Sequence, residues 1–436
     1  MTVKLYHPSI LIAVLALLWA VPASAEDAAA AASLSLQDCI EIAMKNQVDV
    51  LVGENTVTAA KARRTRALSE YYPQVTAEYT SNIAESGAAR PGQTSNTFLS
   101  VSQNFYDGGL REAKVRRSSA EVSQNQFGLE RFRQIVTFSV TSDYFSLLRV
   151  QHLADVQRAR VTYLEGQLAL VQTRVRLGDA AEVEAFPVEA QLANARVDLL
   201  SAENNIRTSA IQLQNTMGLS PAPVFSVQEV EEPASAEIRP VDDYVAAALA
   251  GRPDVRETQA GVKLAKSSVE SAKITLRPRP VIFGQYERSF NGGISDSVSS
   301  SDDSLLITGG LVYDIFNGGY NRAAYREELT NLSNAELRTM QMEKDIQSEV
   351  QQAYLNLKNA EKRIAASDLS LKAAQKNFDA QEGRYKQGLA IPLDLLNAQF
   401  EVVTARSNAV QARYDYYTSI AQLEYAIGKP GGLYGN

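Results

Sequence analysis

Residues 346–388 read IQSEVQQAYLNLKNAEKRIAASDLSLKAAQKNFDAQEGRYKQG, and this stretch decides the fold. It carries a stripe of positions spaced alternately four and three residues apart, and ten of the twelve are apolar. The positions are Ile346, Val350, Ala353, Leu357, Ala360, Ile364, Ser367, Leu371, Ala374, Phe378, Gln381 and Tyr385. A 3.5-residue period sustained this long is typical of a left-handed coiled coil. The stretch therefore predicts one long helix packed along another.

The same stripe occurs 210 residues earlier, again with ten apolar positions out of twelve. Its members are Val136, Val140, Asp143, Leu147, Val150, Ala154, Gln157, Val161, Leu164, Leu168, Val171 and Val175. Residues 110–177 and 320–387 contain no proline and very little glycine, so each can form one unbroken helix. At 1.5 Å per residue, a helix of about 68 residues is on the order of 100 Å long.

The spacing restarts after Gly178 and Gly388, so each glycine predicts a tight turn into a returning antiparallel helix. The restarting positions are Val183, Phe186, Ala190 and Ala193 in one copy and Leu393, Leu396, Phe400 and Val403 in the other. Each copy therefore predicts a long helical hairpin.

Further matches extend the correspondence over the whole chain. Residues 47–50 match 252–255 at an offset of 205, and Gly108-Gly109 matches Gly318-Gly319 at an offset of 210. We infer a tandem repeat with one five-residue insertion at a loop. The predicted parts are a signal peptide (1–25), a first repeat (26–218), an inter-repeat linker (219–240), a second repeat (241–429) and a C-terminal tail (430–436). Each repeat begins with a helix, followed by a β-hairpin at about 73–107 or 279–317 and a helical hairpin at about 109–218 or 319–428.

The predicted β-hairpins rest on alternation of apolar and polar residues. Val75, Ala77, Tyr79 and Ile83 alternate with polar residues, and the segments 94–106 and 303–316 also keep one apolar face. The segment 280–290 alternates poorly. Strands of about ten residues with one apolar face fit a transmembrane β-barrel. Because an open sheet edge cannot remain in lipid, four strands per chain require several chains to close a barrel. Strand count alone allows a dimer with eight strands or a trimer with twelve.

Composition narrows the function classes. The net charge of -7 and the dispersed Lys and Arg residues disfavour nucleic acid as a partner. His152 is the only histidine beyond the expected signal peptide, so we expect no His-pair metal site, no cofactor and no Ser-His or Cys-His catalytic pair. Cys39 is the only cysteine, and we expect it to be a buried small side chain. The protein is therefore not expected to be an enzyme.

Targeting signals point to export. Lys4 precedes an apolar run from Ile10 to Val21, and Ala23-Ser24-Ala25 is a signal-peptidase pattern. No later segment approaches the roughly 20 apolar residues of a helical span. Any membrane crossing is therefore expected to use strands.

The motifs that carry a family resemblance follow one another in order, and all but the first occur in both copies. They are Tyr72-Pro73 before the first strand, Phe105-Tyr106-Asp107-Gly108-Gly109 and Ile315-Phe316-Asn317-Gly318-Gly319 at the strand-to-helix junctions, and Arg-x3-Gly-x5-acid in both turns. Together they resemble the TolC outer-membrane efflux and type I secretion family over essentially the whole mature chain. The resemblance implies a mainly helical protein with membrane strands. It also implies a homotrimer whose twelve-helix α-barrel continues into a twelve-stranded β-barrel in outer-membrane lipid.

The turn motifs supply the candidate site residues. They are Arg174, Gly178 and Glu184 in the first copy and Arg384, Gly388 and Asp394 in the second. The resemblance implies that the tips, with Leu177, Asp179, Gln387 and Leu389, contact a periplasmic adaptor protein. The glycines can also serve only the left-handed turn, and the arginines can cap the last carbonyls of the long helices.

Asp394 and Glu184 are candidate entrance acids, six residues past each turn glycine on the returning helix. In a trimer six carboxylates would attract cations if they face the tunnel, whereas acids in a helix first turn also complement the dipole without any channel role. The resemblance implies that Tyr385 helps to tie the entrance shut, although it is also the last position of the apolar stripe. Ala390 and Asn397 depart from the charged gate residues of the family. We therefore do not expect closure to depend on that ion-pair network.

The predicted function is a passive outer-membrane exit duct of a tripartite efflux pump or type I secretion system. A periplasmic adaptor and an inner-membrane pump of the RND or ABC type are the implied partners. The alternative is a periplasmic coiled-coil adaptor or scaffold, which has long helical hairpins but no membrane strands.

Overall fold

The computed structural model describes residues 33–84, 92–221, 226–230, 239–293, 301–387 and 389–430. The predicted signal peptide, the hairpin-loop residues Ser86, Gly87 and Pro91, and all of the predicted tail except Pro430 lie outside the described residues. Within the described ranges the fold is mainly helical. This confirms the coarse fold class predicted from the sequence.

The helices are α1 (Leu36–Asn46), α2 (Val48–Ser69), α3 (Leu110–Leu177), the short 3-10 helix η1 (Glu182–Glu184), α4 (Ala185–Thr216), α5 (Val241–Gly251), α6 (Pro253–Ile274), α7 (Tyr320–Lys386) and α8 (Pro392–Ala426). The strands are β1 (Gln74–Ala84), β2 (Gly92–Tyr106), β3 (Arg279–Gly293) and β4 (Ser301–Val312).

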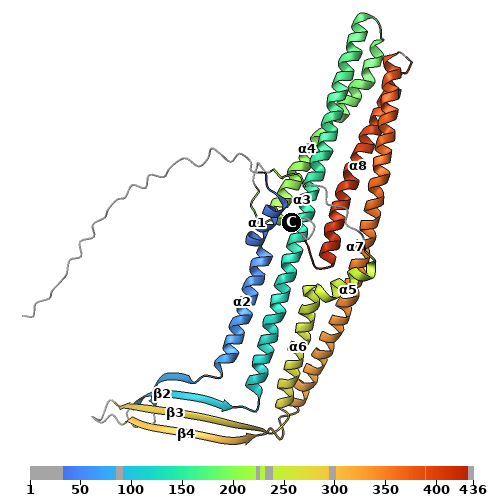
Figure 1. Cartoon of the computed structure of the whole chain (residues 1–436). Helices are drawn as coiled ribbons and strands as arrows, with labels where there is room; N and C mark the ends of the chain where they lie inside the picture. Colours follow the sequence, from blue (N-terminus) through green and yellow to red (C-terminus); the bar gives the residue numbers. More distant parts are fainter. Residues whose placement is uncertain are drawn as a thin grey trace, which may run out of the picture.

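The molecule is a long rod with the sheet at one end and the two helical turns at the other (Figure 1). The long helices α3 and α7 run the whole length. Helices α2 and α4 pack along α3, α6 and α8 pack along α7, and α3 joins the two halves through α6 and α8. Short helices α1 and α5 lie near the middle of the rod (Figure 1). The sheet and the turns are therefore on the order of 100 Å apart, as the rise of an α-helix requires for 68 residues in α3.

The two predicted stripes lie on the buried faces of α3 and α7, which pack along α4 and α8 respectively. All twenty-four stripe positions are buried or half-buried. At the start of α4, however, the buried side chains are Ala185, Val188, Leu192 and Ala195, whereas Phe186, and Val183 in η1, are exposed. The predicted restart positions were wrong there, because α4 turns a neighbouring stripe of mostly small apolar residues toward α3. On α8 the predicted positions Leu393 and Phe400 are exposed as well, and Leu396 is buried.

The four strands form one antiparallel sheet in the order β1-β2-β3-β4. Cross-strand rows alternate in polarity. The row Val75, Val101, Tyr286 and Leu305 is apolar, and the adjacent row Thr76, Ser100, Glu287 and Ser304 is polar. Because side chains alternate between faces, the face that carries the Val75 row is mainly apolar and the opposite face is mainly polar. The first face also carries the Arg288–Asp303 ion pair, and Leu306 lies on the second. Strand β4 ends at Val312, four residues before the predicted apolar run does, because Val312 pairs with Arg279 at the start of β3.

The middle of the rod is held by a core around α1 and α3. Tyr144 is fully buried there, and its hydroxyl donates to the carbonyl of Gln228 at 2.6 Å and lies 3.1 Å from the carbonyl of Leu34. Cys39 lies in the same core, and its burial raises the pKa of the thiol to about 12. The predicted role of Cys39 as a buried small side chain is therefore confirmed.

Candidate functional site

The first helical turn is built around Gly178. This glycine has φ +80°, a backbone conformation that residues with a side chain disfavour. The N–H of Gly178 donates to the carbonyl of Val175, and the N–H of Asp179 donates to the carbonyl of Arg174. The chain turns back through η1 into α4. The glycine therefore ends α3, and its Cβ position meets open space.

The second turn has a different local structure. Helix α7 continues to Lys386, and the N–H of Leu389 donates to the carbonyl of Arg384 at 2.9 Å. The Arg384 guanidinium contacts the Leu389 carbonyl in return, at 3.5 Å. Gly388 lies outside the described residues. Arg384 thus donates to the carbonyl of Leu389 in the turn, whereas the sequence suggested the last carbonyls of the helix itself.

Tyr385 and Arg174 bring the two turns together. Tyr385 is only 7% exposed, and its hydroxyl accepts a hydrogen bond from Nη1 of Arg174 at 3.2 Å. The guanidinium also lies 5.7 Å from the centre of the tyrosine ring, within the range of a cation–π interaction. Arg174 is on α3 and Tyr385 on α7, so this contact ties one hairpin to the other.

The two candidate acids differ in position. Asp394 is exposed in the first turn of α8, as the sequence predicted. Glu184 lies before α4 in η1, where its carboxylate accepts from the N–H of Ala181 at 3.4 Å, so its predicted place on the returning helix was wrong. Helix α4 begins at Ala185, which puts Pro187 in the first turn where its missing N–H is not needed.

Both turns expose apolar side chains. Leu177 is 71% exposed and Leu389 is 64% exposed, and Val183, Ile391 and Leu393 are exposed beside them. Large apolar side chains gathered at the tip of a rod are typical of a protein-binding surface.

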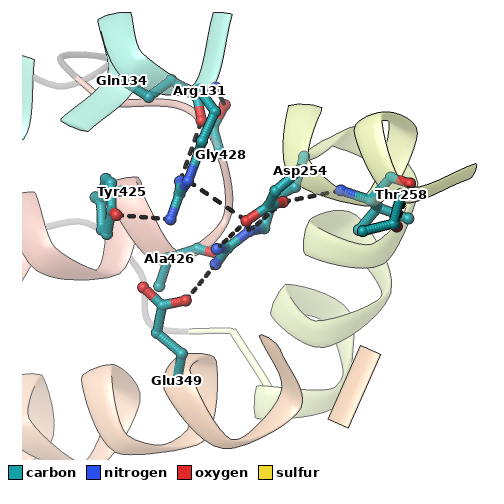
Figure 2. Close-up of polar contacts among 10 residues, drawn as sticks. Arg131, Gln134, Asp254, Thr258, Glu349, Tyr425, Ala426 and Gly428 are labelled. Atoms are coloured by element: carbon teal, nitrogen blue, oxygen red, sulfur yellow. Dashed lines mark hydrogen bonds and ion pairs between the residues drawn. The ribbon is translucent and has the colours of Figure 1, made fainter. Parts of the chain in front are cut away.

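A cluster of charged side chains surrounds the junction of α5 and α6, which lies near the middle of the rod (Figure 1), and Figure 2 shows its contacts. Arg252 is 2% exposed, donates to the carboxylate of Asp254 at 2.6 Å and to that of Glu349 at 2.7 Å, and reaches the carbonyl of Ala426 at 2.8 Å. From α3, Arg131 pairs with Asp254 at 3.4 Å. Burial alone would raise the pKa of Asp254, but the hydrogen bonds and charges of the two arginines lower it.

Two more contacts from α3 close this cluster. Arg131 donates to the hydroxyl of Tyr425 at 2.6 Å, and Gln134 donates to the carbonyl of Gly428 at 2.9 Å (Figure 2). The cluster therefore joins α3 to the start of α6 and the end of α8. Sequence reasoning missed it, although the match between residues 47–50 and 252–255 already contained a shared aspartate.

The described residues hold no group of three or more His, Cys, Asp or Glu side chains that could bind a metal ion. In the same part of the chain, no helix has the length and apolar character of a membrane span.

Comparison with known proteins identifies the family. The family model described as outer membrane efflux protein matches residues 39–219 and 245–429. The chain is 22% identical to outer membrane efflux protein BepC of Brucella suis over 92% of this chain and 86% of the relative. It is 24% identical to outer membrane protein TolC of Vibrio cholerae over 84% of each.

Solved structures give the same fold. The outer membrane protein VceC of Vibrio cholerae aligns with a TM-score of 0.75 at 16% identity, over 91% of this chain and 96% of that one. The CmeC outer membrane channel of Campylobacter jejuni aligns with a TM-score of 0.75 at 17% identity, over 90% and 85%.

These matches confirm the resemblance drawn from the motifs and disfavour the alternative of a periplasmic adaptor. The chain therefore belongs to the outer membrane efflux protein family: it is an outer-membrane efflux channel that extends into the periplasm of a Gram-negative bacterium, and it is not an enzyme.

Proposed function

We propose that three copies of this chain form one continuous duct, with a twelve-stranded β-barrel in the outer membrane and a twelve-helix tunnel in the periplasm. The observation that carries this proposal is the sheet: it has one apolar surface, and within the described residues β1 and β4 are both edge strands. The apolar surface can face lipid, but the unpaired backbone groups of two exposed edges cannot, so an isolated sheet cannot cross the membrane. Pairing β4 of one copy with β1 of the next removes every edge.

The apolar surface is suited to face lipid. Tyr79, Leu305, Ile307 and Leu311 are exposed in the single chain, and the cross-strand rows put Tyr79, Leu305 and Ile307 on the apolar side. The polar rows would then line a water-filled lumen. Tyr313, Ile315 and Phe316 are exposed just beyond β4, at the level where aromatic side chains meet lipid headgroups.

The helical part is a tandem repeat in this proposal, with the repeat and linker boundaries given by the sequence. Matching helix lengths support it: α1 and α5 have 11 residues each, and α2 and α6 have 22 each. Three chains with two hairpins each would supply twelve helices to the tunnel wall.

The turns form the tunnel entrance, and the contact between Arg174 and Tyr385 holds it closed. Among the described residues this hydrogen bond joins the ends of the two hairpins, and the Tyr385 side chain is buried. Asp394, exposed near the tip, and Glu184 would add a ring of six carboxylates. Such a ring favours cations, because two like charges 4 Å apart repel by about 1 kcal/mol in water and about 4 kcal/mol at an effective dielectric of 20.

The exposed apolar tips are the surface for a periplasmic adaptor, which links the duct to an inner-membrane pump of the RND or ABC type. Leu177, Gly178 and Asp179 would contribute from one turn, and Arg384, Gln387, Gly388 and Leu389 from the other. Relatives named for different cargoes, alkaline protease secretion protein AprF and pyoverdine export outer membrane protein OpmQ of Pseudomonas aeruginosa, support a duct whose partners select the substrate.

Mass measurement and electrical recording test the proposal together. The full mature chain, extracted in detergent, should have the mass of three copies and should form discrete cation-preferring channels in planar bilayers. A monodisperse single chain that gives no conductance would contradict the duct.

A further inference from the structure

The two halves of the chain contain the same junction between helices. Between α1 and α2, Gln47 donates through Nε2 to the carbonyl of Thr216 at the end of α4, at 3.4 Å. Between α5 and α6, Arg252 donates to the carbonyl of Ala426 at the end of α8, at 2.8 Å. Gly218 and Gly428 follow these carbonyls with φ of +72° and +82°. The two junctions therefore have corresponding geometry.

The junctions differ in what covers them. In the second half, α3 lies against α6, so Arg131 reaches Asp254 and Gln134 reaches the carbonyl of Gly428 (Figure 2). Pro253 and Asp254 are buried as a result. In the first half, the corresponding residues Val48 and Asp49 are exposed, Val48 by 63%.

The exposed residues of α2 near this junction include Val48, Asp49 and Val52. Val52 is four residues after Val48 and three after Asp49, so its side chain neighbours both. Val52 is 55% exposed. Helix α7 corresponds to α3, so the residues that match Arg131 and Gln134 at the offset of 210 are Gln341 and Lys344. Both are exposed in the single chain.

We propose that α7 of one copy packs on α2 of the next in the same register as α3 packs on α6, with Gln341 and Lys344 over Asp49 and the Gly218 carbonyl. This inference rests on the proposed assembly and names the surfaces that make it. Leu337, four residues before Gln341 and exposed on α7, would cover Val48 and Val52.

The chemistry of the two surfaces is complementary. On α3 the cation Arg131 comes first and the amide Gln134 follows one turn later, whereas on α7 the amide Gln341 comes first and the cation Lys344 follows. In the single chain the Gln341 amide donates to Asp345 at 2.7 Å, so Lys344 is the donor that this surface brings to Asp49. In the first half, Gln47 occupies the position that corresponds to Arg252, so no positive charge of the same chain is placed there beside Asp49. The Lys344 ammonium, with three donors, can serve both the Asp49 carboxylate and the Gly218 carbonyl.

Paired cysteines test the register in the full mature protein. The variant D49C/Q341C should give two-chain and three-chain products with a short bis-methanethiosulfonate linker, which is needed because side chains as long as Arg131 separate the two helices too far for a disulfide. Cys39 can remain, because burial raises its pKa to about 12 and keeps the thiol protonated.

The control variant is E54C/Q341C. Glu54 lies on the same helix but faces α3 of its own chain, where it pairs with Arg133 at 2.8 Å. The test pair should exceed this control at least about tenfold, because thiols held in contact have an effective concentration in the millimolar range. Equal yields from both pairs in a protein that has the mass of three chains would overturn the register and leave the duct standing.

Charge reversal gives a second, independent readout. D49K and K344D should each lower the temperature at which the oligomer dissociates, and the double variant D49K/K344D should restore it. If the double variant is no more stable than the singles, Asp49 and Lys344 do not meet. A protein that is a single chain in every variant would instead contradict the proposed assembly itself.

Discussion

Replacing Tyr385 by Phe should loosen the proposed entrance while leaving the fold unchanged. The substitution removes only the hydroxyl that accepts from Arg174 at 3.2 Å, and the ring keeps its buried position. A hydrogen bond to a charged group contributes about 1.5–3 kcal/mol, and the half-exposed Arg174 favours the low end of that range. Each copy should therefore lose about 1.5 kcal/mol of closed-state stability, which is about tenfold in its opening equilibrium.

The size of the effect depends on how the copies open. If the three entrance contacts break together, about 4.5 kcal/mol is lost and the opening equilibrium shifts by about a thousandfold, whereas independent opening gives about tenfold per copy. Single-channel recording of Y385F in planar bilayers measures the open probability directly. A melting temperature equal to that of the wild type should accompany the change.

Tyr163 provides the matched control. It lies on α3 and its ring packs edge-on against Phe378 of α7, but its buried hydroxyl has no hydrogen-bond partner among the described residues. Y163F therefore removes the same atom from the same kind of site without removing a bond. If Y385F and Y163F have the same open probability as the wild type, the contact with Arg174 does not hold the entrance.

Three further outcomes are expected. Asp394→Ala should widen the entrance or weaken the cation preference of the channel, and unchanged conductance and reversal potential would remove this residue from the entrance. Asp254→Asn should destabilise the protein by about 3–5 kcal/mol, because it leaves buried arginine charges without their carboxylate. The pKa of Asp254 is lowered in the folded state, so its contribution to stability is fully present above the ordinary aspartate pKa and is lost as pH falls through the pKa of the folded protein. Thermal unfolding measured from pH 7 down to acid should therefore depend less on pH in the variant than in the wild type. Gly428→Ala should lower the melting temperature more than Gly178→Ala does. Both glycines have positive φ, but only at Gly428 would the added Cβ meet a neighbour, Cγ of Arg252 at 2.9 Å. Equal losses of melting temperature would mean that backbone strain alone destabilises both variants.

The sequence predicted the long helices well because their signal is long. Twelve positions at a 3.5-residue period leave little room for another structure, and every position of both stripes is buried or half-buried. Strand β3 was harder to predict, because its segment 280–290 alternates poorly. As a central strand it is paired on both sides from Ile282 to Phe290, so backbone hydrogen bonds compensate for the weak alternation of its side chains.

Polar contacts between distant segments were not predictable in the same way. The spacing identified Arg174 and Tyr385 one by one, but their hydrogen bond joins residues 211 apart in the chain. The charge cluster around Arg252 likewise draws on α3, α6, α7 and α8. Such contacts depend on how helices are rotated about their axes, and residue spacing within one helix does not determine that rotation.

The differences between the two halves bear on the symmetry of the assembly. If both junctions were equivalent, a duct could form from six identical half-chains, and the contact between copies would equal the contact within a chain. Instead, Arg131, Asp254 and Arg252 form a buried charge cluster inside one chain, whereas of the corresponding residues Gln341, Asp49 and Gln47 only Asp49 is charged, and Lys344 in place of Gln134 adds one exposed cation. A buried, interlocked ion cluster is costly to expose, so it suits helices that never separate, and a lighter contact with one exposed aspartate suits surfaces that must stay soluble until the copies meet. The charge pattern therefore favours three two-hairpin chains, each folded before assembly, over six interchangeable hairpins.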